Sequence, residues 1–535
     1  MHRILSDSFP RFFVAFIATA AFLLSAFSSI AQEAVLNRND YEDRVQAIWT
    51  AQIIAVIIGW PYEHKTASTQ WLDHFPHPYA TAPIDDDWYY EMCAVRAFEK
   101  YGVGMTADQL GQQWLENSCG SWGSSAQALQ NLRKGIKGSE SGHPRYNKLW
   151  FTIGPQFSAD VYGALAPGMP NTAAQMAREF GHVNGYAEGV DGAVFMAGMI
   201  SLGFFEKDTK TIVRKAAQLI DTSSPYRQCL DQVITMADAG KTFQEIANAI
   251  EDHWHIEYPA TNNAVSNGGI VAASVWFGDG DFLKTVNLAD GAADFTDADC
   301  NGANAASVVA AMHGMKALPP ELVSQLGDRI VGSEMGGVKL TPPVDESITK
   351  LASRTAGIGE EIALNHGGVL ANSTLIISKE EPKAQPAERF TLGDLMKYWN
   401  PDWTLERAGF GGAGGGMAGI RGITYVDGET LATYPRDETR GLVIQRKAAL
   451  SAQPTLDFQV GSAPGHAWEL SVYAENTQLL QKLIVGGTGT DLNWQPIHVD
   501  LKDFAGKEVT LRLYQRVLIP VKPPGDAYWK GLKLE

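Results

Sequence analysis

Apolar residues in the first two thirds of the chain recur mainly at three- and four-residue steps, which is the period of an amphipathic helix. Residues 39–58 show the pattern, with one apolar face made by Tyr41, Val45, Ile48 and Trp49. Residues 190–205 are rich in Ala, Gly and Met, and residues 301–315 are rich in Ala. Small residues of this kind are expected of helices that pack closely in a protein core.

Two local motifs mark the starts of further helices. Thr106 with Gln109, and Thr242 with Glu245, each form a capping box, in which two side chains bond the backbone at the helix start. Few segments between residues 39 and 365 alternate with a period of two. The sequence therefore predicts that residues 32–375 form an all-α domain.

The pattern changes near residue 385. Residues 379–387 are charged and contain proline, which is typical of a linker, and we place the linker at residues 376–395. Short alternating runs separated by Gly, Pro, Asn and Asp follow at residues 456–460, 469–474, 497–501, 509–514 and 529–534. Strands at this spacing predict an all-β sandwich over residues 396–535.

The first 31 residues have the pattern of a secretory signal peptide. Arg3 and Arg11 are basic, residues 12–27 form an uncharged apolar run, and Ser29-Ile30-Ala31 fits a small-x-small cleavage site. The alternative is an uncleaved membrane anchor, but the run of 16 residues is shorter than the ~20 that a spanning helix needs. We therefore predict a secreted or periplasmic protein with no stable membrane insertion after signal removal.

The net charge of the chain limits the classes of binding partner to be expected. Its 43 Lys and Arg residues against 60 Asp and Glu residues give a net charge of −17, so neither nucleic acid nor an anionic membrane face is an expected partner. The four cysteines contain no C-x-x-C pair, and the sequence does not choose among the possible disulfides. The oligomeric state stays open as well.

Two acidic clusters are the candidates for chemistry. The run Asp85-Asp86-Asp87 precedes an apolar-periodic segment, and Asp297-Ala298-Asp299 opens the Ala-rich helix, so both lie at helix starts. Either cluster alone is explained as an acidic helix cap, because the helix dipole favours negative charge there. Two such clusters without neighbouring Lys or Arg indicate instead a site for a hard divalent cation, namely Mg²⁺, Mn²⁺ or Ca²⁺.

Three stretches carry a family resemblance. They are Gly59-Trp60-Pro61-Tyr62-Glu63, then Asp85-Asp86-Asp87-Trp88, and then Asp297-Ala298-Asp299-Cys300-Asn301 with the helix that follows. Their order and spacing over residues 40–365 resemble the ADP-ribosylglycohydrolase family, also called the dinitrogenase-reductase-activating glycohydrolase family. The resemblance implies an all-α bundle that holds two Mg²⁺ ions in a cleft.

The resemblance also implies which residues hold the metal. The candidates are, by motif position, Asp85, Asp86, Asp87, Asp297, Asp299 and Cys300. Asp85 and Trp88 stand where the family usually has threonines, and Cys300 replaces a third threonine. These departures leave the number of ions at one or two.

The family's reaction implies the remaining site residues. Water attacks an anomeric carbon there with the help of a carboxylate, for which the candidates are Asp87, Glu63 and Glu188. Residues 181–191 occupy the family's middle motif, which lines the substrate cleft. The candidates for substrate binding are Trp88, which would stack on a sugar, and the polar residues His182, Asn184, Asp191 and Asn263. A lone polar residue of this kind is more often structural.

The last part of the chain resembles galactose-binding-like jelly-roll modules. Trp494, residues 497–501, residues 504–507 and Trp529 carry this resemblance. Such modules bind glycans in some proteins and serve as packing elements in others, so both roles stay open here.

The leading hypothesis is an exported, metal-dependent glycoside hydrolase that cleaves an N- or O-glycosidic bond by water attack on an ADP-ribosylglycohydrolase scaffold. Its expected partner is a glycan or glycoside substrate. One alternative is an ADP-ribosyl or nucleoside hydrolase. A second alternative, motivated by the missing threonines, is a non-catalytic glycan-binding protein with a degenerate metal site.

Overall fold

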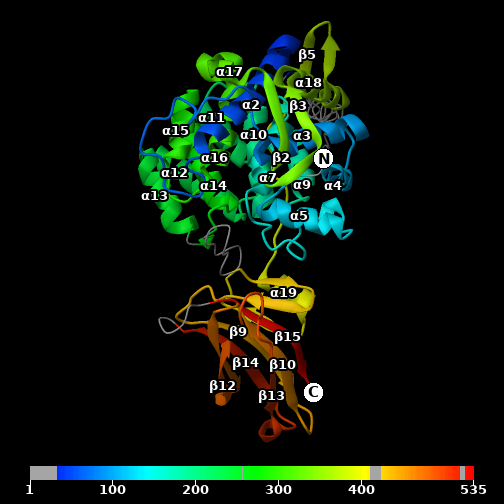
Figure 1. Ribbon diagram of the computed structural model, residues 1–535, viewed down its shortest axis with the longest axis vertical. Coiled ribbons are helices and arrows are strands. Elements are labelled where there is room, and N and C mark those ends of the chain that lie inside the picture. The colour runs from blue at the N-terminus through cyan, green and yellow to red at the C-terminus, as the bar shows by residue number, and fades with distance from the viewer. Residues whose placement is uncertain (1–32, 118, 256, 259, 410–422, 519–524) are drawn as a thin grey trace, which may run out of the picture.

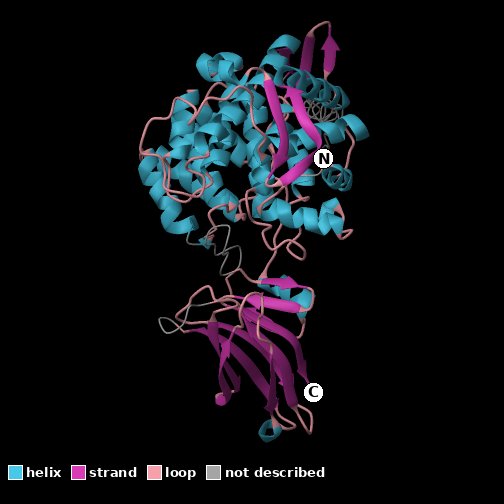
Figure 2. Cartoon of the chain, viewed as in Figure 1, coloured by secondary structure: helices cyan, strands magenta, loops and turns pink. Residues whose placement is uncertain are grey.

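The computed structural model describes residues 33–535 except 118, 256, 259, 410–422 and 519–524. The predicted signal peptide, residues 1–31, lies outside the described residues. Figures 1 and 2 show a helical domain followed by a domain of strands, joined by an extended segment. This two-domain architecture confirms the predicted fold class.

Four long helices form the centre of the first domain. They are α2 (Arg38–Gly59), α10 (Glu188–Gly203), α14 (Ala264–Gly278) and α16 (Ala298–His313). Every residue of α10 after Glu188 is buried, and so is every residue of α16 before His313. A helix that is apolar and small all round can only be stable inside a core. The two Ala- and Gly-rich segments are therefore core helices, as predicted.

Further helices, most of them shorter, surround these four. Those before α10 are α3 (Asp86–Tyr101), α4 (Ala107–Glu116), α5 (Gly123–Arg133), α6 (Gly138–Ser141), α7 (Gly154–Phe157), α8 (Asp160–Ala164) and α9 (Pro170–Gly181). Those after α10 are α11 (Thr209–Ala217), α12 (Pro225–Asp238), α13 (Phe243–Ile250), α15 (Phe282–Asp290), α17 (Pro320–Leu326) and α18 (Ile348–Asn365). Both predicted capping boxes are formed, at the starts of α4 and α13.

Two small sheets were not expected in this domain. The first has the strand order β1-β5-β4, from β1 (Glu33–Asn37), β4 (Val369–Ala371) and β5 (Thr374–Ser378). The second is a hairpin of β2 (Arg329–Met335) and β3 (Val338–Ser347). Because β1 pairs with β5, the start of the described chain is tied to residue 378. The helical domain therefore extends to Ser378, slightly into the predicted linker.

The described residues 379–391 form neither helix nor strand, and α19 (Leu392–Trp399) follows. Two antiparallel five-stranded sheets then pack as a sandwich. One has the order β13-β10-β15-β8-β7, from β7 (Tyr425–Asp427), β8 (Thr430–Thr433), β10 (Thr455–Ser462), β13 (Gln495–Asp500) and β15 (Ala527–Leu534). The other has the order β12-β11-β14-β9-β6, from β6 (Thr404–Glu406), β9 (Leu442–Ala449), β11 (Ala467–Ala474), β12 (Thr477–Val485) and β14 (Glu508–Val517).

All five predicted strand runs are strands of this sandwich, namely β10, β11, β13, β14 and β15. Trp468 of β11 and Trp529 of β15 pack between the sheets with their ring centroids 5.0 Å apart. The inward side chains of both sheets form a core that is separate from the core of the helical domain.

Two further findings concern disulfide bonds and membrane-spanning helices. Cys93, Cys119, Cys229 and Cys300 are all buried and free, so none of the possible disulfides is formed. Across the described residues, no helix combines the length and the apolar character that crossing a bilayer requires.

Candidate functional site

The first acidic cluster lies where α3 begins. Asp85 is the N-cap residue, and its Oδ1 accepts a hydrogen bond from the backbone N–H of Asp87 at 3.1 Å. Its Oδ2 accepts a second bond from the indole Nε1 of Trp60 at 3.0 Å. Asp86 and Asp87 then occupy the first turn, where the helix dipole favours negative charge. The aspartate run is thus held in place by the helix start and by the turn after α2.

The second acidic cluster lies where α16 begins. The backbone N–H of Asp297 donates to Oδ1 of Asn267 at 3.1 Å, and Nδ2 of Asn301 donates to the same oxygen at 2.7 Å. Asn267 therefore fixes the backbone from which Asp297 and Asp299 project. Both aspartates are buried, with relative exposures of 5% and 4%.

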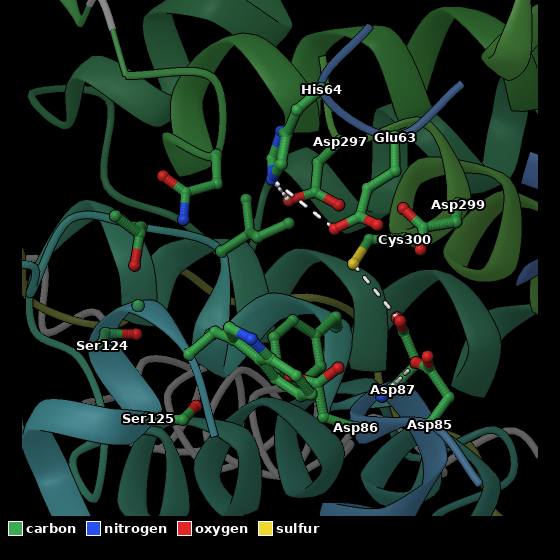
Figure 3. A pocket seen from close by; sticks show the side chains of 17 residues that line it. Glu63, His64, Asp85, Asp86, Asp87, Ser124, Ser125, Asp297, Asp299 and Cys300 are labelled. Carbon is green, nitrogen blue, oxygen red and sulfur yellow. Dashed lines mark hydrogen bonds and ion pairs between the residues drawn. The ribbon is translucent and has the colours of Figure 1, made fainter. Parts of the chain in front are cut away.

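The two clusters meet on one cavity of about 250 Å³. Figure 3 shows their carboxylates facing each other across it. The thiol of Cys300 donates a hydrogen bond to Oδ2 of Asp87 at 3.4 Å and so links the second cluster to the first. The close approach depends on Gly59, because a Cβ at that position would lie 2.5 Å from the Cα of Asp299.

A third pair of side chains reaches the cavity from the turn after α2. His64 has its Nε2 3.6 Å from Oδ2 of Asp297 and 3.7 Å from Oε1 of Glu63. Its backbone has φ of 53° and is held by a 2.8 Å bond from its N–H to the carbonyl oxygen of Thr296. Sequence reasoning placed Glu63 in the site and missed His64. The clue to His64 in the sequence was that it directly follows Glu63.

The crowded carboxylates strongly disfavour negative charge. Burial, and then the charge of Asp297, raises the pKa of Glu63 to about 7. Burial, followed by the neighbouring carboxylates, raises the pKa of Asp86, Asp87 and Asp299 well above the usual value. None of the lining residues that the structure describes is a lysine or an arginine. A bound cation would relieve the repulsion that these residues leave uncompensated.

The donor set fits a hard divalent cation. Three groups have their potential ligand atoms within 4.8 Å of one another, namely Asp85 with Asp86 and Asp87, Asp297 with Asp299 and Cys300, and Glu63 with His64 and Asp297. Oδ1 of Asp87 and Oδ1 of Asp299 are buried, and neither has a hydrogen-bond partner among the described residues. Buried carboxylate oxygens without a donor are ligands that Mg²⁺, Mn²⁺ and Ca²⁺ prefer. Burial raises the pKa of the Cys300 thiol, so the thiol stays protonated and can donate its hydrogen bond to Asp87.

The opposite wall of the cavity comes from the start of α5. Trp122 is 40% exposed at this wall, and Ser124 and Ser125 follow it in the first turn. Nδ2 of Asn184 donates to Oγ of Ser125 at 3.0 Å, so Asn184 supports the wall from behind. Sequence reasoning missed most of the further lining residues, which are Gly123, Thr152, Ile153, Gly154, Phe157 and Asn262.

The sequence profile of the ADP-ribosylglycohydrolase family matches residues 37–360, which is more than half of the chain. The chain belongs to this family. The match spans α2 to α18 and includes every described residue that lines the cavity. The scaffold is therefore that of a glycohydrolase family, and the residue pattern from which we inferred the resemblance is confirmed.

Other comparisons give more distant similarity. A solved structure described as "ADP-ribosylglycohydrolase-related protein complex" is 15% identical with a TM-score of 0.43, and the match covers 60% of this chain and 99% of that one. A structure described as "CBM4 structure and function" is 13% identical with a TM-score of 0.18, covering 25% of this chain and 88% of that one. A CBM51 structure from Clostridium perfringens GH95 in complex with methyl-galactose is 15% identical with a TM-score of 0.15, covering 22% and 72%. No curated protein matches the chain.

Four of the predicted site residues lie behind the cavity rather than on its wall: Asn184, which supports Ser125 and was predicted to bind substrate, and the three described next. Trp88 is fully buried in the core of the family domain. Glu188 accepts a 3.1 Å hydrogen bond from the hydroxyl of Tyr258. Asn263 caps α14 by accepting from the N–H of Ser266, while its neighbour Asn262 reaches the cavity. In the described chain these three are not among the lining residues.

Residues 181–191, which occupy the family's middle motif, have a structural role in this chain. Nε2 of His182 lies 2.8 Å from Oε1 of Glu388, and Arg178 pairs with both Glu388 at 3.3 Å and Asp191 at 3.0 Å. Glu388 belongs to the segment between the two domains. His182 and Asp191 therefore help to hold that segment on the helical domain, and neither is among the described residues that line the cavity.

Proposed function

We propose that the protein is a divalent-cation-dependent hydrolase that cleaves an N- or O-glycosidic bond at an anomeric carbon. The observation that carries this proposal is the meeting of two acidic clusters, distant in sequence, on one open cavity. The clusters also have to offer free ligand atoms to a cation. Oδ1 of Asp87 and Oδ1 of Asp299, which have no hydrogen-bond partner within the described part of the chain, support that requirement.

The proposed metal ligands are the aspartates of the two clusters. Asp85 is the least suited of them, because both of its carboxylate oxygens already accept hydrogen bonds from the protein. Asp86, Asp87, Asp297 and Asp299 remain as the proposed ligands for one or two ions, with Mg²⁺ as the proposed ion. When bound, such an ion positions sugar hydroxyls and lowers the pKa of a water molecule.

Glu63 is the proposed general base. Its side chain is 39% exposed, so it can reach a water molecule in the cavity, whereas Asp87 is buried and already accepts the Cys300 thiol. As the water oxygen bonds to the anomeric carbon, Glu63 takes up its proton. The glycosidic bond breaks with its electron pair on the leaving group. The neighbouring carboxylates stabilise the positive charge that develops on the sugar ring.

The metal requirement gives a direct test. We expect hydrolysis to stop in EDTA and to return with Mg²⁺, and saturating Mg²⁺ should raise the melting temperature of the helical domain by about 5–10 °C. The stabilisation follows because an ion that binds only the folded carboxylate clusters favours the folded state. Activity assays and calorimetry of the same samples measure both effects. Full activity in EDTA would contradict the proposal.

One observation favours an ADP-ribosyl or nucleoside substrate as the second candidate. The first turn of α5 points its Ser124 and Ser125 at the cavity, and none of the described side chains caps this helix start. The free N–H groups of a helix start bind anions such as a diphosphate. Arguing against this candidate, the described lining residues contribute no basic side chain. A panel of aryl glycosides, nucleosides and ADP-ribosyl-arginine, each with and without EDTA, separates the two hydrolases.

The same panel tests the non-catalytic alternative. A protein that only binds glycans would turn over none of these compounds and would show no calorimetric response to Mg²⁺. We further propose export to the periplasm or the medium, with cleavage after Ala31. The mass of the protein recovered from those fractions checks this, because the predicted mature chain begins at Gln32.

A further inference from the structure

A second cavity, of about 340 Å³, lies on the outer face of the sheet β12-β11-β14-β9-β6. Its size is at the lower end of small-molecule pockets, which measure about 300–1,000 Å³. The cavity belongs to the β-sandwich alone and is lined by Arg440, Ser471, Tyr473, Asn476, Arg512, Tyr514 and Arg516. We refer to it as the arginine–tyrosine pocket.

Strand register explains why these side chains share one face. In the β11–β14 pair, Tyr473 is opposite Arg512 and Ser471 is opposite Tyr514. Residues two apart on a strand point to the same side, so Arg516 joins them. The alternate residues of both strands are buried in the sandwich core. The pocket is therefore built on regular strands whose inward side chains are fixed by packing.

The charge of the pocket is opposite to that of the protein. The chain carries a net charge of −17, yet three arginines line this cavity. Arg516 pairs with Glu469 at 3.2 Å, whereas Arg440 and Arg512 have no carboxylate partner among the described residues. Nε of Arg512 is buried and has no hydrogen-bond acceptor in the described chain. Nη2 of Arg512 donates to the backbone carbonyl oxygen of Glu475, so this guanidinium is held in place without being neutralised. Guanidinium groups that lack a carboxylate partner are suited to bind carboxylate or sulfate oxygens.

Two tyrosine rings give the pocket a second feature, an aromatic surface that suits a sugar ring. The rings of Tyr473 and Tyr514 meet edge to face with their centroids 5.7 Å apart. Aromatic rings beside polar groups pack against the apolar faces of sugar rings. Ser471 and Asn476 add groups that bond hydroxyls. A bare anion would contact the arginines and not the rings, so the combination favours a sugar that carries a negative charge.

We propose that the arginine–tyrosine pocket binds an acidic saccharide. Its tyrosines contact the sugar ring, and Arg440 and Arg512 bind the carboxylate or sulfate group. Binding at this pocket requires no metal and does not depend on the reaction proposed for the helical domain. The sandwich would thereby hold the enzyme on an anionic glycan.

The test is calorimetric titration of the full chain in EDTA. The probes are hexasaccharides with carboxylates (oligogalacturonate), with sulfate esters but no carboxylates (a κ-carrageenan hexasaccharide) or with neither (xylohexaose), together with inorganic sulfate. We expect one or both acidic oligosaccharides to bind, more tightly than xylohexaose or sulfate, and to bind more weakly at high salt. Which acidic probe binds identifies the anionic group.

Substitutions test whether the saccharide binds in the arginine–tyrosine pocket. Arg440 is exposed, so R440Q should fold normally and weaken binding by about ten- to hundredfold, because it removes a charge-assisted hydrogen bond. Y473A should weaken binding by about three- to tenfold, and Y473F should bind as the wild type does. The control is K533Q, which removes one exposed positive charge from β15 in the other sheet and should change nothing.

Three results would overturn the proposal: no binding of either acidic probe, equal binding of inorganic sulfate or xylohexaose, or equal effects of R440Q and K533Q. Loss of hydrolysis elsewhere on the protein would leave these titrations unaffected. A negative result for saccharide binding at the pocket can therefore be told apart from a negative result for the proposed hydrolase activity.

Discussion

Replacement of Asp299 by asparagine is expected to lower kcat/KM by about a thousandfold or more without unfolding the protein. Asp299 projects into the cavity from the first turn of α16, and its buried Oδ1 has no hydrogen-bond partner among the described residues. Under the proposed function this oxygen is a metal ligand, and losing several kcal/mol of charge stabilisation in the transition state lowers the rate by about this factor. Steady-state kinetics at saturating Mg²⁺ measure the effect.

The stability of the D299N variant should change in the opposite direction. Burial, and then repulsion from Asp297, Glu63 and Asp87, raises the pKa of Asp299, so the metal-free protein should melt at a higher temperature once this carboxylate is gone. The wild type should gain stability from Mg²⁺, and the variant should gain less. Calorimetry in EDTA and in Mg²⁺ separates this outcome from simple misfolding.

Asp290 provides a matched control. It is also a buried aspartate, neither of its oxygens has a hydrogen-bond partner in the described chain, and it does not line the cavity. Burial raises the pKa of its carboxyl well above the usual value, so a negative charge is disfavoured at this position and the neutral amide of D290N should be tolerated with activity kept. Equal loss of activity in D290N and D299N would show that any change in this core inactivates the enzyme, and the assignment of Asp299 would then fail.

The acidic clusters were predictable because each is continuous in sequence. The run Asp85-Asp86-Asp87 and the pair Asp297 and Asp299 stand at helix starts, and local sequence determines where a helix begins. Their meeting on one cavity depends on the packing of α2, α3 and α16, which only the family resemblance could suggest. The position of Glu63 followed from the same resemblance.

The residues that sequence reasoning missed have no such local signature. Ser124, Ser125 and Thr152 reach the cavity because α5 and the segment before α7 pack across it, and a single Ser or Thr in a sequence carries no information about what it will face. Conversely, His182 and Asp191 are polar residues in a family motif, yet here His182 binds the interdomain Glu388 directly and Asp191 holds it through Arg178. Long-range contacts, rather than residue type, decide between these roles.

The small sheet β1-β5-β4 escaped prediction for a similar reason. Its longest strands have five residues each, and β1 pairs with β5 across more than three hundred residues of chain. A run this short has too few positions to show a reliable period of two. Alternating patterns were readable in the sandwich because its central strands are longer and one face of each packs into the core.

Replacement of Gly59 by alanine is expected to cost about 1–3 kcal/mol in the free energy of unfolding of the helical domain. Gly59 is the last residue of α2, and an added Cβ would lie 2.5 Å from the Cα and 2.9 Å from the backbone nitrogen of Asp299. Because both atoms belong to the backbone of α16, rotation of a side chain cannot relieve the overlap. The two helices would have to move apart.

That movement would also damage the site. Glu63 follows α2 by four residues and Asp299 lies at the contact itself, so their separation would change directly. A displacement near 1 Å at reacting groups can cost about a hundredfold in rate, and we expect at least that loss in kcat/KM for G59A. Gly357, inside α18, is the matched control, since a Cβ there would meet nothing within 4 Å. G357A should stabilise the helix by about 0.5–1 kcal/mol and keep activity, whereas normal stability and activity in G59A would show that α2 and α16 do not approach as closely as this site requires.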